Sequence, residues 1–320
     1  MLTRRATLAG LAALAAPLRA HAQPTPGRTI TIVVPYPPGG PVDLVARLLA
    51  QESDLGQVVV DNRAGASGVV GTLAVARAEP DGQTLVRGTN QTHATNQSLI
   101  KNCPYDATRD FAPVAGLALI PHVLVVRKDL AVLTVDDLVA TAKAKPGGFS
   151  YGSTGNGSGS HLAGELFKTK AGVDLLHVPF KGVAPMTTEL LAGRVDLSIA
   201  PLPGLISQQI EAGNLHALAT ASTRRAPKLP SVPTMAQAGL PGVEADAWFA
   251  LFAPARTPPA MIDRLYQAFT MALRKDGVRS NLAGQGLVIA IRTPAEMTAM
   301  LPGEVEKWAA VIRAANVVLD

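Results

Sequence analysis

Short runs of β-branched and apolar residues alternate along the chain with stretches in which apolar residues recur at helical spacing. One such stretch has Val42, Val45, Ala46 and Leu49 on a single helix face. This alternation is typical of an α/β protein with mainly parallel strands. The runs predict strands at residues 29–34, 58–60, 84–87, 123–126, 149–151, 175–178 and 195–199.

Capping signals mark where two of the helices begin. Thr134 and Asp137 resemble a capping box, and Thr293 precedes a proline at the first helical position with Glu296 three residues on. The last helix should run from about 294 toward 315. No repeat of fixed period and no long Pro-rich or Ser/Gly-rich linker is present. Two lobes that the chain crosses between more than once therefore fit better than independent domains.

The first 22 residues have the pattern of an export signal. Arg4 and Arg5 precede the apolar run 6–18, and residues 20–22 form a small-x-small cleavage site. The run is shorter than the roughly 20 residues that a spanning helix needs. We therefore expect cleavage after Ala22 and a periplasmic protein. The arginine pair resembles a twin-arginine signal, and ordinary Sec export fits comparably well.

Charge and composition exclude several classes of function. The chain has 29 Lys and Arg against 24 Asp and Glu, and the leader holds three of the basic residues and no acid. The mature chain is thus nearly neutral, and aromatic residues make up only 4% of the sequence, which argues against nucleic-acid binding. Cys103 is the single cysteine, so neither an internal disulfide nor a thiolate metal site is expected.

Residues 35–43 form a proline- and glycine-rich loop between the first predicted strand and a helix that begins near Pro41. Gly39 and Gly40 leave backbone N–H groups unhindered, and a helix N-terminus adds partial positive charge. This combination suits a carboxylate. A plain strand-to-helix turn, with Asp43 supporting the first helical turn, explains the same residues equally well.

A second glycine-rich loop, residues 152–161, follows the predicted strand 149–151. It offers hydroxyl groups and unhindered N–H groups, which suit an oxyanion. Ligands of open α/β sheets bind beyond the carboxyl ends of the strands, so two such loops, one in each lobe, are expected to face each other across a cleft. His161 opens the following helix and would direct a ring N–H into that cleft, although a histidine is more often a hydrogen-bonded structural residue.

Motifs for nucleotide binding and for catalysis are missing. No glycine loop leads into Gly-Lys-Ser/Thr, and Ser160 occupies the place of the third glycine of the dinucleotide fingerprint. No serine has the G-x-S-x-G context of a hydrolase nucleophile. The histidines are scattered, with no pair at i, i+4 for zinc. The sequence therefore predicts no catalytic residue, no cofactor and no metal.

Six ordered segments resemble the solute receptors of tripartite tricarboxylate transporters, also called Bug receptors. The resemblance covers nearly the whole mature chain, and the order of the segments makes it specific. They read ITIVVPYPPGGPVDLVARLLA, LGQVVVDNRAGASGVVGTLAVARAEPDGQTL, YDATRDFAPV, FSYGSTGNGSGSHLAGELF, VPFKGVAPMTTELLAGRVDL and WFALFAPARTPPAMIDRL.

The resemblance implies a type II periplasmic-binding-protein fold, with two α/β lobes joined by two crossing strands and a ligand cleft between them. We assign residues 23–121 and 250–320 to lobe 1 and residues 122–249 to lobe 2. Lys181 would pair with a second ligand carboxylate, or else be a solvated turn residue. The implied ligand-binding residues are Tyr36, Pro38, Gly39, Gly40, Asp43, Thr89, Asn90, Ser153, Thr154, Gly157, Ser158, His161, Phe180, Lys181, Gly182 and Ala184.

The function expected from the resemblance is that of an extracytoplasmic receptor, not an enzyme, which binds a small mono- or dicarboxylic acid. Its partners would be the membrane permease subunits of a tripartite transporter or a sensor protein, and we expect a monomer. One alternative is an exported enzyme that acts on a carboxylated substrate; another is a chain that has lost binding and serves as a structural partner. The sequence does not identify the acid.

Overall fold

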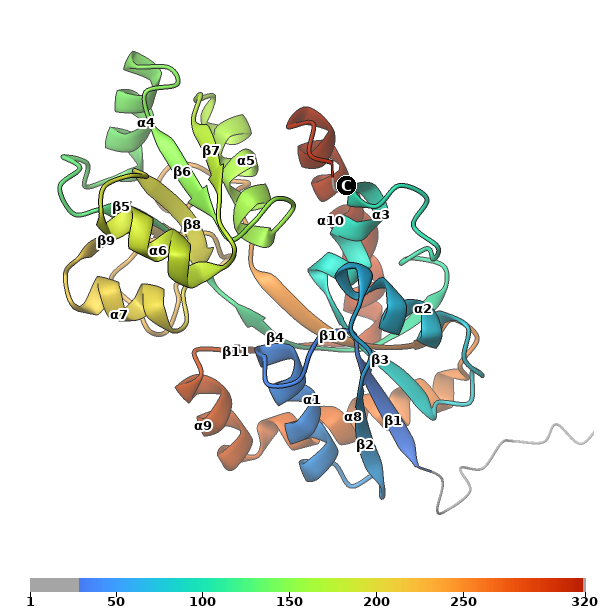
Figure 1. Ribbon diagram of the computed structural model, residues 1–320. Helices are drawn as coiled ribbons and strands as arrows, with labels where there is room; N and C mark the ends of the chain where they lie inside the picture. Colours follow the sequence, from blue (N-terminus) through green and yellow to red (C-terminus); the bar gives the residue numbers. More distant parts are fainter. Residues whose placement is uncertain (1–28, 319–320) are drawn as a thin grey trace, which may run out of the picture.

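The computed structural model describes residues 29–318, which form two mixed β-sheets flanked by helices (Figure 1). The first sheet has the strand order β11-β4-β10-β3-β1-β2, and the second has the order β7-β6-β8-β5-β9. The strands of the first sheet are β1 (Ile30–Val34), β2 (Val58–Asn62), β3 (Thr84–Thr89), β4 (Phe111–Ile120), β10 (Ala247–Pro254) and β11 (Val288–Arg292). Those of the second are β5 (His122–Arg127), β6 (Ser150–Ser153), β7 (Leu176–Pro179), β8 (Leu197–Pro201) and β9 (Leu215–Thr220).

Helices cover both faces of the first sheet, with α1 and α8 on one face and α2, α3 and α10 on the other (Figure 1). The second sheet is flanked by α4 to α7. The helices are α1 (Pro41–Glu52), α2 (Val69–Ala76), α3 (Asn96–Leu99), α4 (Val135–Ala144), α5 (Gly159–Ala171), α6 (Val183–Leu191), α7 (Leu205–Glu211), α8 (Pro259–Arg274), α9 (Asp276–Gly284) and α10 (Pro294–Ala314). A 3₁₀ turn, Ala66–Gly68, precedes α2, and a π-helical turn, Gln91–Thr95, precedes α3.

The α/β class and the two-sheet architecture are confirmed, but the prediction of mainly parallel strands was wrong. Strand β1 is parallel to β2 and β3, and β6 is parallel to β7 and β8, whereas β4, β5, β10 and β11 pair only antiparallel. Strands β4, β9, β10 and β11 were not predicted. Much of β4 and β10 is alanine and other residues without β-branching, so their strand state comes from burial between neighbouring strands.

Helix signals in the sequence were more informative. The predicted capping box at Thr134 with Asp137 is present, and the predicted N-cap Thr293 also forms a capping box, with Glu296. Helix α10 begins at Pro294, as predicted, and ends at Ala314. Caps depend only on residues within one turn, which is why the sequence alone locates them.

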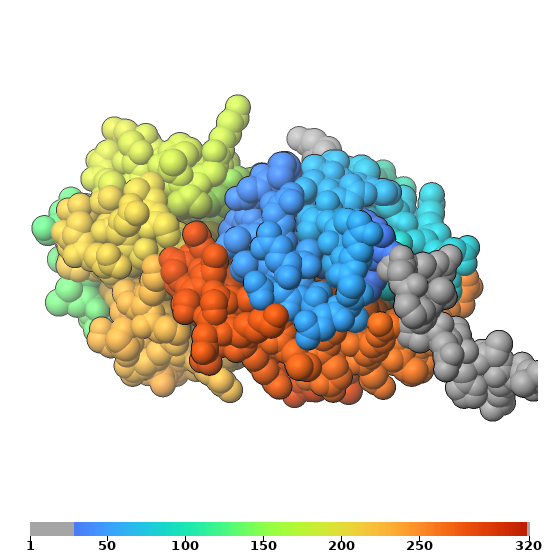
Figure 2. Space-filling model, turned by 90° about the horizontal axis from the view of Figure 1, so that it is seen from below, coloured from blue at the N-terminus to red at the C-terminus, as the bar shows by residue number. Residues whose placement is uncertain are grey.

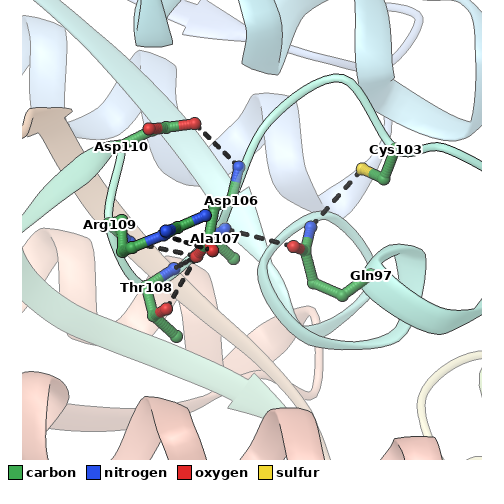
Figure 3. Close-up of polar contacts among 7 residues, drawn as sticks. All are labelled: Gln97, Cys103, Asp106, Ala107, Thr108, Arg109 and Asp110. Carbon is green, nitrogen blue, oxygen red and sulfur yellow. Dashed lines mark hydrogen bonds and ion pairs between the residues drawn. The ribbon is translucent and has the colours of Figure 1, made fainter.

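The family segment that begins at Tyr105 forms a turn that leads into β4 (Figure 3). Asp106 Oδ1 accepts hydrogen bonds from the backbone N–H and the hydroxyl of Thr108, and Oδ2 accepts one from Arg109 Nε at 2.7 Å. Burial alone would raise the pKa of Asp106, but these hydrogen bonds lower it below its ordinary value. The segment therefore shapes the entry to a central strand.

The chain passes between the two sheets where β4 leads into β5 and where residues 221–246 lead into β10. The two passages lie side by side, because Ala221 N–H donates to the His122 carbonyl at 2.8 Å. Within the second passage Ala245 N–H donates to the Ala221 carbonyl, also at 2.8 Å, so the residues just before β10 lie at the same place. This arrangement is the pair of crossing strands of the type II fold. The lobe boundaries given above stay a prediction.

Asp246 ties these passages together. Its carboxylate accepts a short hydrogen bond from the Ser222 hydroxyl and a further one from the backbone of His122. Burial raises the pKa of Asp246 from 3.8 to about 7, against smaller opposing effects of these hydrogen bonds and of Lys307. The carboxyl group therefore keeps its proton in the folded protein at pH values where the unfolded chain has lost it.

We predict that the titration of Asp246 lowers the free energy of unfolding as pH rises from about 4 to 7. Across this range the folded state binds more protons than the unfolded state. Asp246→Asn keeps an acceptor oxygen and removes the titration. Its free energy of unfolding should depend less on pH across this window and exceed that of the wild type at pH 8. Urea unfolding at several pH values measures this, with Asp263→Asn, exposed on α8, as the control. Equal slopes for wild type and Asp246→Asn would contradict the prediction.

Candidate functional site

A cavity of about 250 Å³ lies between the two sheets and is lined from both. Both predicted glycine-rich loops, or the helix turns directly after them, reach it. Its lining residues are Tyr36, Pro41, Val42, Thr89, Asn90, Gln91, Thr95, Ile120, His122, Thr154, Gly157, Gly159, Ser160, Leu162, Pro201, Ala247 and Phe249. The lining contains no Lys, Arg, Asp or Glu, so hydrogen-bonding groups and apolar surface define it.

Two helix N-termini face this cavity. The first N–H groups of a helix have no partner inside the helix and carry partial positive charge. In α1 the N-cap is Gly40, which has no side chain to cap them, and Val42 lines the cavity. In α5 the Ser158 hydroxyl caps the N–H of His161, which leaves the N–H groups of Gly159 and Ser160 without a partner in the described chain. The arrangement suits an anion.

Asp43 holds the first loop together and does not line the cavity. Its buried carboxylate accepts hydrogen bonds from Gly39 N–H at 2.9 Å, Arg47 Nε at 2.8 Å and Asn62 Nδ2 at 2.9 Å. Burial alone would raise the pKa of Asp43, but the hydrogen bonds from Arg47, Gly39 and Asn62 lower it below its ordinary value. Gly39, with φ of +90°, uses its N–H here and lies exposed beside Pro38.

The first sheet contributes a polar group to the cavity wall. Tyr36 Oη lies 2.9 Å from Thr89 Oγ1 and donates to Gln91 Oε1 at 3.3 Å. Burial raises the pKa of Tyr36 to about 12, so the phenol is neutral. Asn90 is 8% exposed and lines the cavity, and its side-chain amide makes no hydrogen bond within residues 29–318. That amide is available to a ligand.

The second loop presents Thr154, Gly157 and Ser160 to the cavity. Ser160 Oγ accepts a hydrogen bond from Thr154 N–H at 2.8 Å and lies 2.9 Å from Thr154 Oγ1. Ser158 Oγ lies 3.1 Å from Ser160 Oγ and caps α5. The hydroxyl groups of Thr154, Ser160 and Ser158 thus form a hydrogen-bonded row beside the N-terminus of α5.

Ser153 and His161 lie behind the second loop and do not line the cavity. Ser153 Oγ lies 2.7 Å from His177 Nε2, and the His161 ring stacks on His177 with 3.8 Å between ring centroids. His161 Nδ1 accepts the Gly157 N–H at 3.0 Å. This nitrogen therefore shapes the loop from beneath instead of directing an N–H into the cleft.

The third group of predicted residues, at the start of α6, is also outside this cavity. The Phe180 ring packs close to Gly152 beside Met186. Gly182, with φ of +110°, is the N-cap of α6. Lys181 and Ala184 are exposed, and Lys181 makes no ion pair within residues 29–318. Ligand contact by any of the sixteen predicted residues stays a prediction.

Sequence reasoning missed twelve of the lining residues. Pro41, Val42, Gly159 and Ser160 lie inside the predicted loops, in the first turns of α1 and α5, and the rule that a helix N-terminus binds anions would have found them. The others reach the cavity only through folding. They are Gln91, Thr95, Ile120, His122, Leu162, Pro201, Ala247 and Phe249.

Arg87 on β3 is a buried cation close to this wall. Its side chain is fully buried, and its Cζ lies 4.4 Å from the ring centroid of Phe249, a lining residue. Nη1 donates to the Gly88 carbonyl at 2.9 Å, whereas Nε and Nη2 have no partner in the described chain. Burial lowers the pKa of Arg87 to about 9, so it remains charged at neutral pH without a carboxylate beside it.

A larger hollow of about 520 Å³ lies between the lobes on another face, between α9, β11 and the segment 226–228. Figure 2 shows this face, where α9 in orange-red lies beside the yellow part of the second lobe. Gly286 packs against Pro203 there. Neither glycine-rich loop lines this hollow, and neither of the two helix N-termini reaches it. We therefore take the smaller cavity as the candidate site.

Within residues 29–318, no group of three His, Cys, Asp or Glu side chains is arranged to hold a metal ion. No helix in that range is both long and apolar enough to cross a bilayer.

Comparison with known proteins decides the family. The model of the tripartite tricarboxylate transporter family receptor matches residues 45–317. The chain belongs to this family. A curated relative, Protein BugT of Bordetella pertussis, is 39% identical over 306 residues, which is 94% of this chain and 93% of BugT. The expected family is thereby confirmed.

Solved structures of family receptors have the same fold. A Rhodopseudomonas palustris protein with adipate is 37% identical with a TM-score of 0.72, covering 92% of this chain and 99% of its own. MatC from the same organism, with bound malate, is 33% identical with a TM-score of 0.70 and covers 90% and 99%. A solute-binding protein from Polaromonas reaches a TM-score of 0.81 at 28% identity, covering 91% and 99%.

Family membership assigns this receptor to the periplasmic solute-binding proteins and not to the enzymes. The alternative of an exported enzyme is therefore not supported. The predicted leader and its cleavage after Ala22 lie outside the described residues.

Proposed function

We propose that this receptor binds a small mono- or dicarboxylic acid in the cavity between its lobes. The observation that carries the proposal is the convergence of two helix N-termini, those of α1 and α5, on one cavity that has no acidic group in its lining. Partnerless N–H groups at a helix N-terminus attract anions. Adipate and malate, the ligands named for two similar receptors, are both carboxylates.

The cavity limits the size and chemistry of the ligand. About 250 Å³ accommodates a small acid, and Val42, Ile120, Leu162 and Phe249 offer apolar surface to its body. Asn90 supplies an amide, and the hydroxyls described above supply further hydrogen bonds. Arg87, behind Phe249, adds positive potential that is weakly screened because it is buried.

Binding would be detected as closure of the two lobes about the crossing passages. Lobe 1 comprises residues 23–121 and 250–320, and lobe 2 comprises residues 122–249. A ligand that contacts both lobes favours the closed arrangement, which the permease subunits of a tripartite transporter, or a sensor, would then recognise. We expect a monomer, exported by a leader that is cleaved after Ala22, and no cofactor.

A thermal-shift screen of the chain from Gln23 onward against mono-, di- and tricarboxylates and their amides tests the proposal. A ligand at 100 times its Kd should stabilise the protein by about 2.7 kcal/mol. We expect a shift with at least one acid and not with its amide. No shift with any acid, for folded protein freed of carried-over ligand, would overturn carboxylate binding.

Gly159→Pro tests the contribution of the α5 N-terminus. Proline is well tolerated at the first helical position, where it removes only an N–H that the helix does not use. We expect at least tenfold weaker binding of the acid found in the screen, with little change in melting temperature. Gly159→Ala keeps the N–H, and its Cβ would lie 3.6 Å from the nearest atom, an ordinary contact. Equal affinities of the proline and alanine variants would contradict a role for this N–H.

Arg87→Met tests whether the buried guanidinium serves the anion. Replacing an unpaired buried charge with an apolar side chain should stabilise the ligand-free protein, by about 1–3 kcal/mol, while it weakens carboxylate binding about tenfold. Denaturant unfolding and calorimetric titration measure the two effects, and Arg87→Lys, which retains the charge, should bind more tightly than Arg87→Met. Unchanged affinity in Arg87→Met would show that the charge plays no part.

A further inference from the structure

His122 is a polar residue at the floor of the cavity that none of the sequence patterns indicated. It is the first residue of β5, directly after the passage from β4, and it lines the cavity although its side chain is only 3% exposed. Its backbone is held by Asp246 and by Ala221. The backbone that carries the ring is therefore held in place where the two lobes meet.

Neither ring nitrogen of His122 makes a side-chain hydrogen bond that satisfies ordinary geometry within residues 29–318, and Nδ1 is wholly buried. By contrast, His161 accepts the Gly157 N–H, and the His177 ring pairs with the Ser153 hydroxyl. Buried polar side chains normally have partners, and leaving one without costs about 1–3 kcal/mol. Nδ1 is out of reach of a ligand in the cavity, but Nε2 is not among the wholly buried atoms and is open to one.

The Nε2 edge of the ring is the edge that meets the cavity at the start of α5. A Cβ placed on Gly159 would lie 3.6 Å from His122 Nε2 and 4.0 Å from Cε1. Gly159 lines the same cavity. Nε2 is therefore close to the place where an anion at the α5 N-terminus would sit.

The ring is neutral and its environment distinguishes the two nitrogens. Burial lowers the pKa of His122 to about 4, and the Ile120 carbonyl raises it by a smaller amount. A neutral imidazole has one N–H donor and one bare acceptor nitrogen. Nδ1 is the wholly buried nitrogen and the one nearer the main chain, so we place the proton there, toward the Ile120 carbonyl. The positive end of α5 favours a lone pair at Nε2.

We propose that His122 is a specificity residue, whose Nε2 accepts a hydrogen bond from the ligand. The ligand would then be a carboxylate that also carries a donor, such as a hydroxyl, an amide N–H or an ammonium group. This inference rests on the proposed carboxylate binding. A plain acid that presents only methylene groups to Nε2 leaves it without a partner, and such sites discriminate strongly against the analogue that lacks the donor.

Pairs of acids that differ by one hydroxyl group test the proposal: malate with succinate, lactate with propionate, and 3-hydroxybutyrate with butyrate. In calorimetric titrations of the full mature chain, we expect at least one hydroxy acid to bind about tenfold more tightly than its partner. In His122→Met the ratio should fall to near one. In His122→Gln, which retains an acceptor, part of the preference should return. Melting temperatures of both variants report whether they are folded.

The possible outcomes separate the two proposals. If no acid binds, carboxylate binding fails and this inference fails with it. If acids bind but the wild type does not prefer the hydroxy acid, or His122→Met keeps the preference, the receptor function stands and the role of His122 is overturned.

A measurement on the ligand-free wild type gives an answer even if the variants do not fold. Proton–nitrogen correlation spectra of the histidine rings should show His122 at pH 7 as the Nδ1–H tautomer, with Nε2 shifting when a hydroxy acid is added. An Nε2–H tautomer would overturn the proposal.

Discussion

Backbone N–H groups at the start of α1 and α5 have no partners in their own helices, and the fold brings both sets to one cavity. Because these donors belong to the main chain, their positions depend on where the two helices begin. Several of the surrounding contacts fix those positions. Asp43 holds the loop before α1 through three hydrogen bonds, and Ser158 caps α5 while its neighbour Ser160 ties down Thr154.

The two halves of this site come from different sheets, so their separation depends on the passages between the sheets. Ala221 joins these passages by a backbone hydrogen bond to His122, and the Asp246 carboxyl group contacts both through Ser222 and the backbone of His122. His122 lies at the same junction and reaches the cavity. The candidate site and the passages between the sheets therefore meet in one small region, so ligand binding there, as proposed, would change the relation of the lobes.

The predicted ligand-binding residues divide between the cavity wall and its support. Tyr36, Thr89, Asn90, Thr154 and Gly157 line the cavity, and their contact with a ligand stays a prediction. Asp43, Ser153 and His161 lie in the same loops but use their polar atoms to support them. A sequence shows that a loop carries such side chains. It does not show which of them turn outward, because that depends on partners such as Asn62 and His177, which are distant along the chain.

The sequence by itself determined the α/β class and the family, which depend on the order of segments along the chain. It also determined the two glycine-rich loops and the caps of α4 and α10, since each of these depends on residues that are close along the chain. Tertiary structure decided the antiparallel strands β4 and β10, whose alanine-rich sequences become strands only when neighbours bury them. It also decided that Arg87 lies unpaired behind Phe249 and that His122 faces the cavity. Burial and the convergence of distant segments produce these features, and neither leaves a periodic trace in the sequence.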